Sequence, residues 1–310
     1  MRSRLALILA LVLSIFVLAI PLENSVVRAE APAPAQTPAP AAPRRAPSQN
    51  NQYVLFMPMT QRSAVAAPAP QPPSKKGVGL TYHDCDTVAK VGATWEYGWT
   101  PQPDNCPGVE NIPMLYQASD VGGTVGGNSN WIMGFNEPDS PDQANIPASQ
   151  AATLWRQVEQ LYPNRKLVAP APSGADPTWL VDFRNDYISM YGTAPRLNAL
   201  AVHCYAWSAN ACIQFTQQFE AWAKAWGVPE VWVTEFSISP ASPNNLNQSL
   251  QGGQAFLNWM ESDPMITRYE WFASRIKGTE PWASSYFDTP LVDWNSGALT
   301  AFGQMYVAYH

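Results

Sequence analysis

Two glutamates in this sequence stand where apolar runs end, and together they could do chemistry. Glu137 follows a run that begins at Trp131, and Glu235 follows a run that begins at Val231. Apolar runs of this length are typical of strands buried on both faces in a parallel sheet. Because a (β/α)8 barrel carries its catalytic groups at the carboxyl ends of such strands, the two carboxyl groups could meet over one substrate.

Hydrolysis of a glycosidic bond is one reaction that such a pair performs. A retaining mechanism needs two carboxyl groups about 5–5.5 Å apart, one to protonate the departing oxygen and one to attack the anomeric carbon. We expect Glu137 to be the acid/base and Glu235 the nucleophile. Asn136, directly before the acid, could bind a sugar 2-hydroxyl. The alternative is that both are ordinary surface glutamates at loop starts, but two such motifs in this order favour the chemical interpretation.

The alternation of side chains along a strand predicts which neighbours share the site. If His203 points into the barrel mouth, Cys204 points toward the helical layer and Tyr205 returns to the mouth. We likewise expect Trp271 to face the mouth and stack on a sugar ring, which would place Glu270 outside. A satisfied core histidine is the alternative for His203.

Three further aromatic residues follow predicted strands and are candidates for substrate binding. Tyr82 ends the first predicted strand, Trp99 follows the second and Trp207 follows the sixth. Aromatic residues are more often part of a core, so position alone carries this prediction.

The first 29 residues are typical of an export signal. Arg2 and Arg4 precede an apolar stretch over 5–22, and residues 27–29 offer a cleavage site at Ala29. We expect cleavage near Ala29. An uncleaved N-terminal anchor is the alternative, because the apolar stretch is long enough to span a bilayer. Either way, the rest of the chain is expected to be secreted or held at the cell surface.

Composition divides the remainder into a linker and one domain. Eleven of the 47 residues in 30–76 are proline, which is typical of an extended, disordered spacer. Residues 77–310 contain all 13 tryptophans and carry 10 Lys and Arg against 22 Asp and Glu. This acidic, aromatic domain is a poor partner for nucleic acid or anionic lipid and is compatible with a neutral polymer.

An even number of cysteines in an exported chain predicts disulfides. The four cysteines are Cys85, Cys106, Cys204 and Cys212. Three connectivities are possible, and we expect the local one, which joins the first two and the last two. A zinc site formed by His83, Cys85, His203 and Cys204 is the alternative, but its spacing matches no standard ligand pattern.

Alternating strand and helix patterns predict a (β/α)8 barrel. The eight predicted strands are 78–82, 94–97, 112–116, 131–135, 167–169, 199–203, 231–234 and 269–272. Helical spacing of apolar residues predicts helices over 148–161 and 250–260 and another with a stripe of Phe215, Phe219, Trp222 and Trp226. No glycine-rich dinucleotide or phosphate loop is present in the sequence, so we expect no cofactor, and we expect no metal ion.

Four motifs resemble one known family, glycoside hydrolase family 128, the glycosyl hydrolase catalytic-core family. They lie at 134–139, 200–205, 231–236 and 268–273, in order across 77–310. The resemblance implies a (β/α)8 barrel of a retaining clan that acts on β-1,3-glucan. It also implies that Glu137 is the acid/base, that Glu235 is the nucleophile, and that four residues support the sugar: Asn136, His203, Tyr205 and Trp271.

The sequence departs from the family pattern at three positions. Phe135 and Cys204 stand where tryptophan is frequent and could alter the shape of a subsite, and Glu270 replaces a small residue. The leading hypothesis is an exported, monomeric endo-β-1,3-glucanase whose partner is a β-glucan, with no membrane partner beyond an N-terminal anchor. The alternatives are a hydrolase of another β-linked wall polysaccharide and a binding or adhesion module on an inactive barrel.

Overall fold

The computed structural model describes residues 74–239, 245–280 and 289–309. By internal contacts the chain divides into residues 1–66 and 67–310, and every described residue belongs to the second unit. The predicted export signal and nearly all of the predicted linker lie outside the described residues. Within the described ranges, no helix combines the length and apolar character that a membrane span requires.

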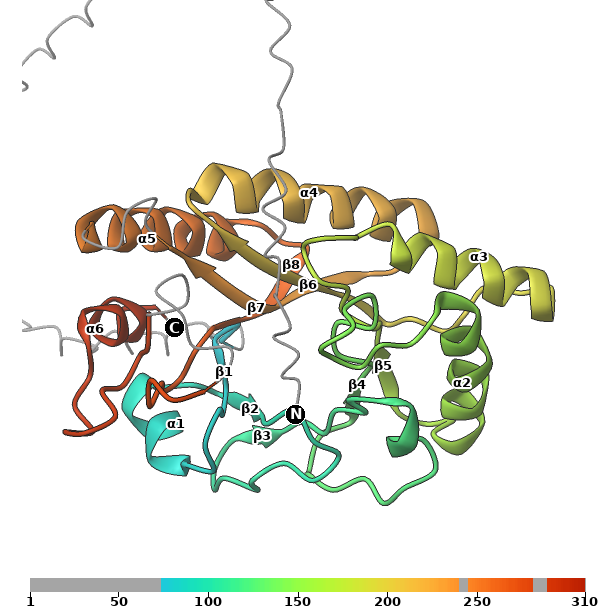
Figure 1. Cartoon of the computed structure of the whole chain (residues 1–310), viewed down its shortest axis with the longest axis horizontal. Coiled ribbons are helices and arrows are strands. Elements are labelled where there is room, and N and C mark those ends of the chain that lie inside the picture. Colours follow the sequence, from blue (N-terminus) through green and yellow to red (C-terminus); the bar gives the residue numbers. More distant parts are fainter. Residues whose placement is uncertain (1–73, 240–244, 281–288, 310) are drawn as a thin grey trace, which may run out of the picture. The chain divides into compact units, whose positions relative to one another are not determined.

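The fold is α/β, with parallel strands in a curled sheet that fits a (β/α)8-like barrel (Figure 1). One sheet holds β1 (Gly77–Gly79), β2 (Trp95–Tyr97) and β3 (Glu110–Asn111). The other holds β4 (Trp131–Met133), β5 (Lys166–Val168), β6 (Ala199–Ala206), β7 (Glu230–Ile238) and β8 (Ile266–Trp271). Parallel bridges from Met114 to Met133 and from Lys76 to Tyr269 join the two sheets at both edges.

In the described part of the chain, six α-helices lie outside the strands (Figure 1). They are α1 (Cys85–Val91), α2 (Ala148–Leu161), α3 (Trp179–Tyr191), α4 (Ala209–Trp226), α5 (Leu246–Ser262) and α6 (Ala301–Val307). The predicted helix over 148–161 is confirmed as α2. The aromatic stripe lies within α4, as predicted, and the predicted helix over 250–260 lies within α5.

The first part of the barrel differs from the predicted alternation. No α-helix separates β2 from β3, and only a short 3₁₀ turn, Ala118–Asp120, lies between β3 and β4 in this described stretch. The third strand also begins earlier than predicted, because Glu110 and Asn111 pair with β2. The predicted strand 112–116 instead contacts β4 through single backbone bonds, such as Leu115 N–H to the Met133 carbonyl at 3.0 Å.

Both predicted disulfides are confirmed. Cys85 bonds to Cys106, which ties α1 to the loop between β2 and β3, and Cys204 bonds to Cys212, which ties β6 to α4. A disulfide sulfur cannot serve as a thiolate ligand, so the zinc alternative is excluded.

Large aromatic side chains fill the barrel interior near the strand starts. Trp95, Trp131 and Trp232 are buried there, and the Arg268 guanidinium lies 4.4 Å from the Trp232 ring centroid. Arg268 also forms an ion pair with Glu110 at 2.6 Å, which compensates its charge. This packed base leaves the carboxyl ends of the strands as the end that can hold a site.

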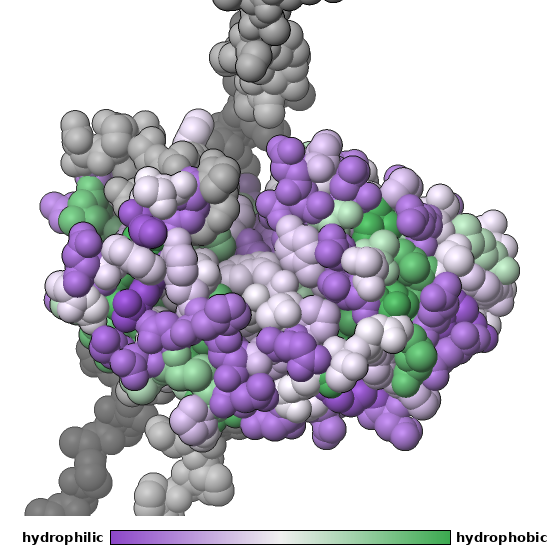
Figure 2. All heavy atoms as spheres, turned by 60° about the horizontal axis from the view of Figure 1, so that its bottom comes forward, coloured by the Kyte–Doolittle hydropathy of each residue, from purple (hydrophilic) through white to green (hydrophobic). Residues whose placement is uncertain are grey.

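Hydrophilic residues predominate on the molecular face drawn in Figure 2, and hydrophobic ones gather toward one side of it. The exposed large apolar side chains include Leu161 of α2 and Met190 and Tyr191 of α3.

Candidate active site

Glu137 is held in a sharp backbone turn directly after β4. Gly134 lets this segment approach the chain after β5, because a Cβ there would lie 2.6 Å from the Pro170 nitrogen. Asn136 then bridges to Ala171, and the Glu137 N–H donates to the Ala171 carbonyl at 2.8 Å. Glu137 itself has a φ of 39°, a left-handed conformation that non-glycine residues rarely adopt. The turn therefore fixes where its carboxyl group points.

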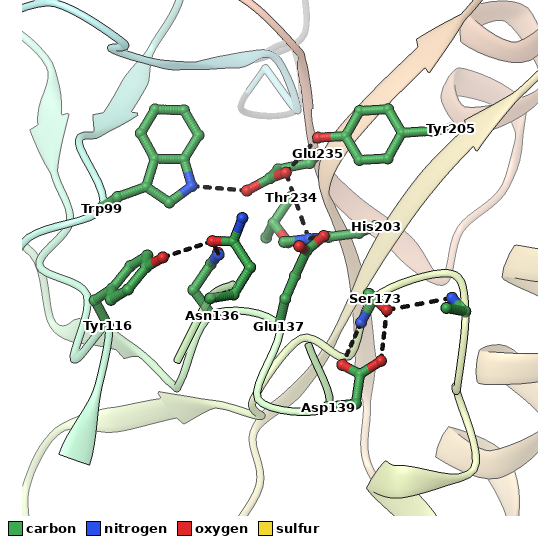
Figure 3. Close-up of polar contacts among 12 residues, drawn as sticks. Trp99, Tyr116, Asn136, Glu137, Asp139, Ser173, His203, Tyr205, Thr234 and Glu235 are labelled. Atoms are coloured by element: carbon green, nitrogen blue, oxygen red, sulfur yellow. Dashed lines mark hydrogen bonds and ion pairs between the residues drawn. The ribbon is translucent and has the colours of Figure 1, made fainter. Parts of the chain in front are cut away.

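Glu235 lies on β7 and is surrounded by polar groups from β6 and from the loop after β2 (Figure 3). The Trp99 indole N–H donates to its Oε1 at 2.7 Å, and the Tyr205 hydroxyl donates to its Oε2. His203 Nδ1 lies 3.4 Å from the same Oε2. These groups orient the carboxylate and stabilise its charged form.

The two glutamates meet at His203 (Figure 3). His203 Nδ1 lies 2.9 Å from Glu137 Oε1, and one ligating atom from each of the three residues lies within 4.8 Å of the others. This separation is near the range of retaining glycosidases and well below the 6.5–9.5 Å of inverting ones. The three atoms are also close enough to share a cation; the prediction that the site uses no metal ion stays a prediction.

Burial and charge act against each other in this trio. Burial raises the pKa of Glu235, while His203, Tyr205 and Trp99 act to lower it. For His203, burial lowers the pKa, but the charges of Glu235 and Glu137 outweigh this and raise it above the usual histidine value. The imidazole is fully buried, and its Nε2 has no hydrogen-bond partner among the described residues.

Asn136 and Asp139 lie beside Glu137 with different partners. Asn136 is 3% exposed and donates from Nδ2 to Gln143 Oε1, which also accepts from the Tyr116 hydroxyl. Its Oδ1 is buried without a described partner and could accept a hydrogen bond from a sugar hydroxyl. Asp139 accepts from the Ser173 N–H at 2.7 Å and so holds the loop after β5.

The alternation predicted on β6 is correct, but the one predicted on β8 is wrong. Trp271 is fully buried in the outer core, where it contacts Phe302 of α6 and donates to the Thr289 carbonyl at 2.8 Å. Glu270 faces the interior instead and accepts from the Gly79 N–H. From Arg268 to Trp271 the side chains of β8 do alternate, but with the opposite phase.

Phe135 and Cys204, where the sequence departs from the family pattern, also lie away from the site. Phe135 is fully buried and its ring contacts Trp155 of α2, and Cys204 is in the disulfide to α4. Both side chains therefore belong to the outer core, so the expectation that they shape a subsite is wrong.

The other aromatic candidates lie at different distances from the pair. Trp99 contacts Glu235 directly, as described above. Tyr82 instead contacts Glu280, and its ring centroid lies 4.6 Å from that of Trp294. Trp207 follows Tyr205 on β6 by two positions and is 59% exposed. The structure thus places Trp99 in the site, in contact with the carboxylate of Glu235.

Sequence reasoning missed Tyr97 and Phe272. The Tyr97 hydroxyl contacts Glu270 and the Thr234 carbonyl, and the Phe272 ring lies 5.7 Å from both the Trp99 and Tyr205 rings. Shifting the predicted alternation on β8 by one residue would have placed Phe272, in place of Trp271, in the site. The interior position of Tyr97 could have been found from the alternation on β2.

A family model described as the glycosyl hydrolase catalytic core matches residues 77–306. This chain belongs to glycoside hydrolase family 128. It is therefore a glycoside hydrolase by family, as the sequence motifs implied. No curated protein sequence matches the chain.

Solved family 128 structures share the fold across about three quarters of this chain. One is a subgroup II endo-β-1,3-glucanase from Pseudomonas viridiflava, 26% identical, covering 76% of this chain and 98% of its own with a TM-score of 0.62. A subgroup I endo-β-1,3-glucanase from Amycolatopsis mediterranei, in complex with laminaripentaose, is 23% identical and covers 76% and 100% with a TM-score of 0.61. A subgroup V exo-β-1,3-glucanase from Cryptococcus neoformans is 23% identical and covers 75% and 98% with a TM-score of 0.60.

Proposed function

We propose that this protein is an exported endo-β-1,3-glucanase that retains configuration through a two-glutamate mechanism. The observation that carries the proposal is the meeting of Glu137, in the turn after β4, and Glu235, in the carboxyl-terminal half of β7, within 4.8 Å. The endo-β-1,3-glucanase from Pseudomonas viridiflava supports the substrate class and the mode of attack.

The geometry suggests a role for each group in a double displacement. Glu137 protonates the departing glycosidic oxygen while the Glu235 carboxylate attacks the anomeric carbon to form a glycosyl-enzyme. Glu137 then takes a proton from water, which attacks the same carbon and releases Glu235. His203 lies between the carboxyl groups and can stabilise whichever is charged, while Asn136 can bind the 2-hydroxyl of the sugar.

The decisive test is Glu235→Gln assayed on laminarin. Because the amide cannot form the glycosyl-enzyme, we expect loss of activity by at least about 10⁴-fold with the fold unchanged by circular dichroism. Glu230→Gln is the matched control, since Glu230 lies at the other end of β7 and accepts from Trp232 and Thr267. Near-parental turnover by Glu235→Gln would refute the assignment.

Trapping with a slow fluorosugar substrate tests the same residue independently. We expect mass spectrometry to find the label on the peptide that contains Glu235. A label on a peptide with Glu137 would exchange the two roles, and the absence of any label in an active enzyme would contradict the retaining mechanism.

The substrate and the mode of attack are tested by product analysis. Assay on β-1,3-, β-1,4- and mixed-linked glucans should show release of reducing ends from the β-1,3-glucan, with oligosaccharides of several lengths from the start. Preference for another linkage would select the alternative wall-polysaccharide substrate. Glucan binding without any hydrolysis would select the binding-module alternative.

Export and a monomeric state are part of the proposal and rest on the sequence. The basic and apolar leader in residues 1–29 supports export. N-terminal sequencing of protein recovered from the medium should begin near position 30. Recovery of the whole chain with the membrane fraction would select the uncleaved anchor, and sedimentation of the recovered protein tests the monomer.

A further inference from the structure

The residue before the proposed nucleophile does not take part in the regular strand ladders. Val233 pairs with Val202 of β6, but the next partner of β6 is Glu235, so Thr234 is skipped. The pairing of β7 with β8 also shifts between Val233 and Phe236. Instead, the Thr234 carbonyl accepts a hydrogen bond from the Tyr97 hydroxyl at 2.7 Å, from the opposite side of the interior. Tyr97 therefore anchors the bulge that presents Glu235.

Glu270 contacts the same Tyr97 hydroxyl. It is fully buried, its Oε2 accepts from the Gly79 N–H at 3.2 Å, and its Oε1 lies 3.1 Å from the Tyr97 hydroxyl oxygen. Gly79 makes room for this contact, because a Cβ there would lie 3.2 Å from Glu270 Oε1 and 2.8 Å from the Trp99 ring. Glu270 and the indole that binds Glu235 thus pack against the same glycine.

Counting protons decides how these groups are bonded. A phenol has one proton, and a carbonyl oxygen can only accept, so the proton of Tyr97 is needed at Thr234. The contact between Glu270 and Tyr97 then requires a proton from Glu270, because two acceptor oxygens would otherwise face each other. Both contacts are satisfied together when Glu270 is a carboxylic acid that donates to the Tyr97 oxygen while Tyr97 donates to the Thr234 carbonyl.

The charges around Glu270 favour the same state. The titratable groups that act on it are Tyr97 of β2, Tyr205 of β6, Glu235 of β7 and Tyr306 of α6, and none is a cation. No ion pair among the described residues involves Glu270. Burial, reinforced by the charge of Glu235, raises the pKa of Glu270 well above the usual carboxyl value.

We propose that Glu270 is a positioning residue, held as a neutral carboxylic acid, whose hydrogen bond directs Tyr97 onto the Thr234 carbonyl and so fixes the bulge that carries Glu235. The proposal rests on the proposed nucleophilic role of Glu235.

The protonation state is tested without any assay of activity. Infrared difference spectra between the parent and Glu270→Gln at pH 7 should show loss of the carbonyl stretch of one protonated carboxyl group. Loss of a carboxylate band instead would mean that Glu270 is ionised and would overturn the proposal. Because this measurement does not depend on the substrate, it distinguishes failure here from failure of the proposed function.

The positioning role is tested by kinetics on laminarin. Glu270→Met removes the donor while filling the space, and we expect about a tenfold loss in kcat with KM nearly unchanged. Glu270→Gln keeps a neutral donor and should stay within about threefold of the parent. Tyr97→Phe should lose as much as Glu270→Met, and the double variant should lose no more, because the two residues act in one chain.

A matched control is Glu96→Met, which removes another fully buried glutamate whose side chain faces away from the interior on β2. It should keep kcat within about twofold even where it lowers stability. The positioning role would be refuted by parental kcat in Glu270→Met, by equal losses in Glu270→Gln and Glu270→Met, or by additive losses in the double variant.

Discussion

The chain holds its two candidate catalytic glutamates in different ways. Glu137 lies in a turn after a short strand, its side chain is 15% exposed, and its hydrogen-bond partner is His203. Glu235 lies within the nine-residue strand β7, its side chain is 6% exposed, and groups from β6 and the loop after β2 contact both of its oxygens. One carboxyl group is left open and the other is enclosed.

This difference fits different chemical tasks. An acid/base must reach both a departing oxygen and a water molecule, so its carboxyl group has to be accessible. A nucleophile must be ionised and aimed at one carbon, which fixed donors favour even where burial opposes its charge. Substitutions at Glu137 and at the groups that hold Glu235 should therefore change the kinetics of the enzyme in different ways.

The largest expected effect after loss of the nucleophile is that of Glu137→Ala. Loss of the proton donor should lower kcat on laminarin by about 10²–10⁴-fold. The loss should be far smaller on a dinitrophenyl β-glucoside of matching linkage, because that leaving group departs without protonation. The second substrate serves as an internal control, because the same variant is assayed on both. Equal losses on both would contradict the role of Glu137 as the acid.

A smaller effect is expected from Tyr205→Phe, which removes one donor from Glu235. We expect about a tenfold lower kcat/KM. The Tyr205 hydrogen bond lowers the pKa of Glu235, so its loss should raise that pKa further. Since activity needs ionised Glu235, the acidic limb of the pH profile should move to higher pH.

The control for this shift is Tyr187→Phe, which removes a hydroxyl that donates to Glu159 on the outer helices. Its pH profile should match that of the parent. An unchanged acidic limb in Tyr205→Phe would show that the hydroxyl does not control the charge of Glu235.

The smallest effect on activity is expected from Glu96→Gln. This variant tests how burial shifts the pKa of a carboxyl group that lacks the fixed donors of Glu235. Burial, with a further contribution from Asp104, raises the pKa of Glu96 from 4.5 to about 8. A raised carboxyl pKa contributes stability below pH 4.5 that is lost as the pH rises toward 8. Glutamine stays neutral, so the variant should equal the parent in free energy of unfolding at pH 4 and exceed it by about 4 kcal/mol at pH 8.

Urea unfolding at pH 4, 6 and 8 measures this difference, and kcat on laminarin should be unchanged throughout. A constant stability difference at all three values would show that Glu96 does not titrate in this range. A change in kcat would show that Glu96 acts on the site, contrary to its outward position.

Much of the site could be predicted because its residues stand next to strong local signals. Apolar runs leading to Glu137 and Glu235 located strands β4 and β7, although β7 continues past Glu235 to Ile238, and the spacing of the cysteines located both disulfides. Helical periodicity located α2 to the residue. These features depend on neighbours in the sequence, and they are the ones that sequence reasoning recovers.

The errors share a physical cause. Alternation along β8 predicts that Glu270 and Trp271 face opposite sides but does not say which side each one takes. The packing of Trp271 against α6 and the contact of Glu270 with Gly79 and Tyr97 decide it. The missing helix between β2 and β3 likewise depends on a loop tied by Cys85 and Cys106.

By itself, then, the sequence determined the strand order, the two glutamates and the family of this protein, because each is written in short-range patterns. Only the tertiary structure decided the phase of β8, the bulge at Thr234 and the partners that Tyr97 contacts across the interior. Those features depend on contacts between side chains that are far apart along the chain, and no local sequence pattern encodes which of these side chains lie close together in space.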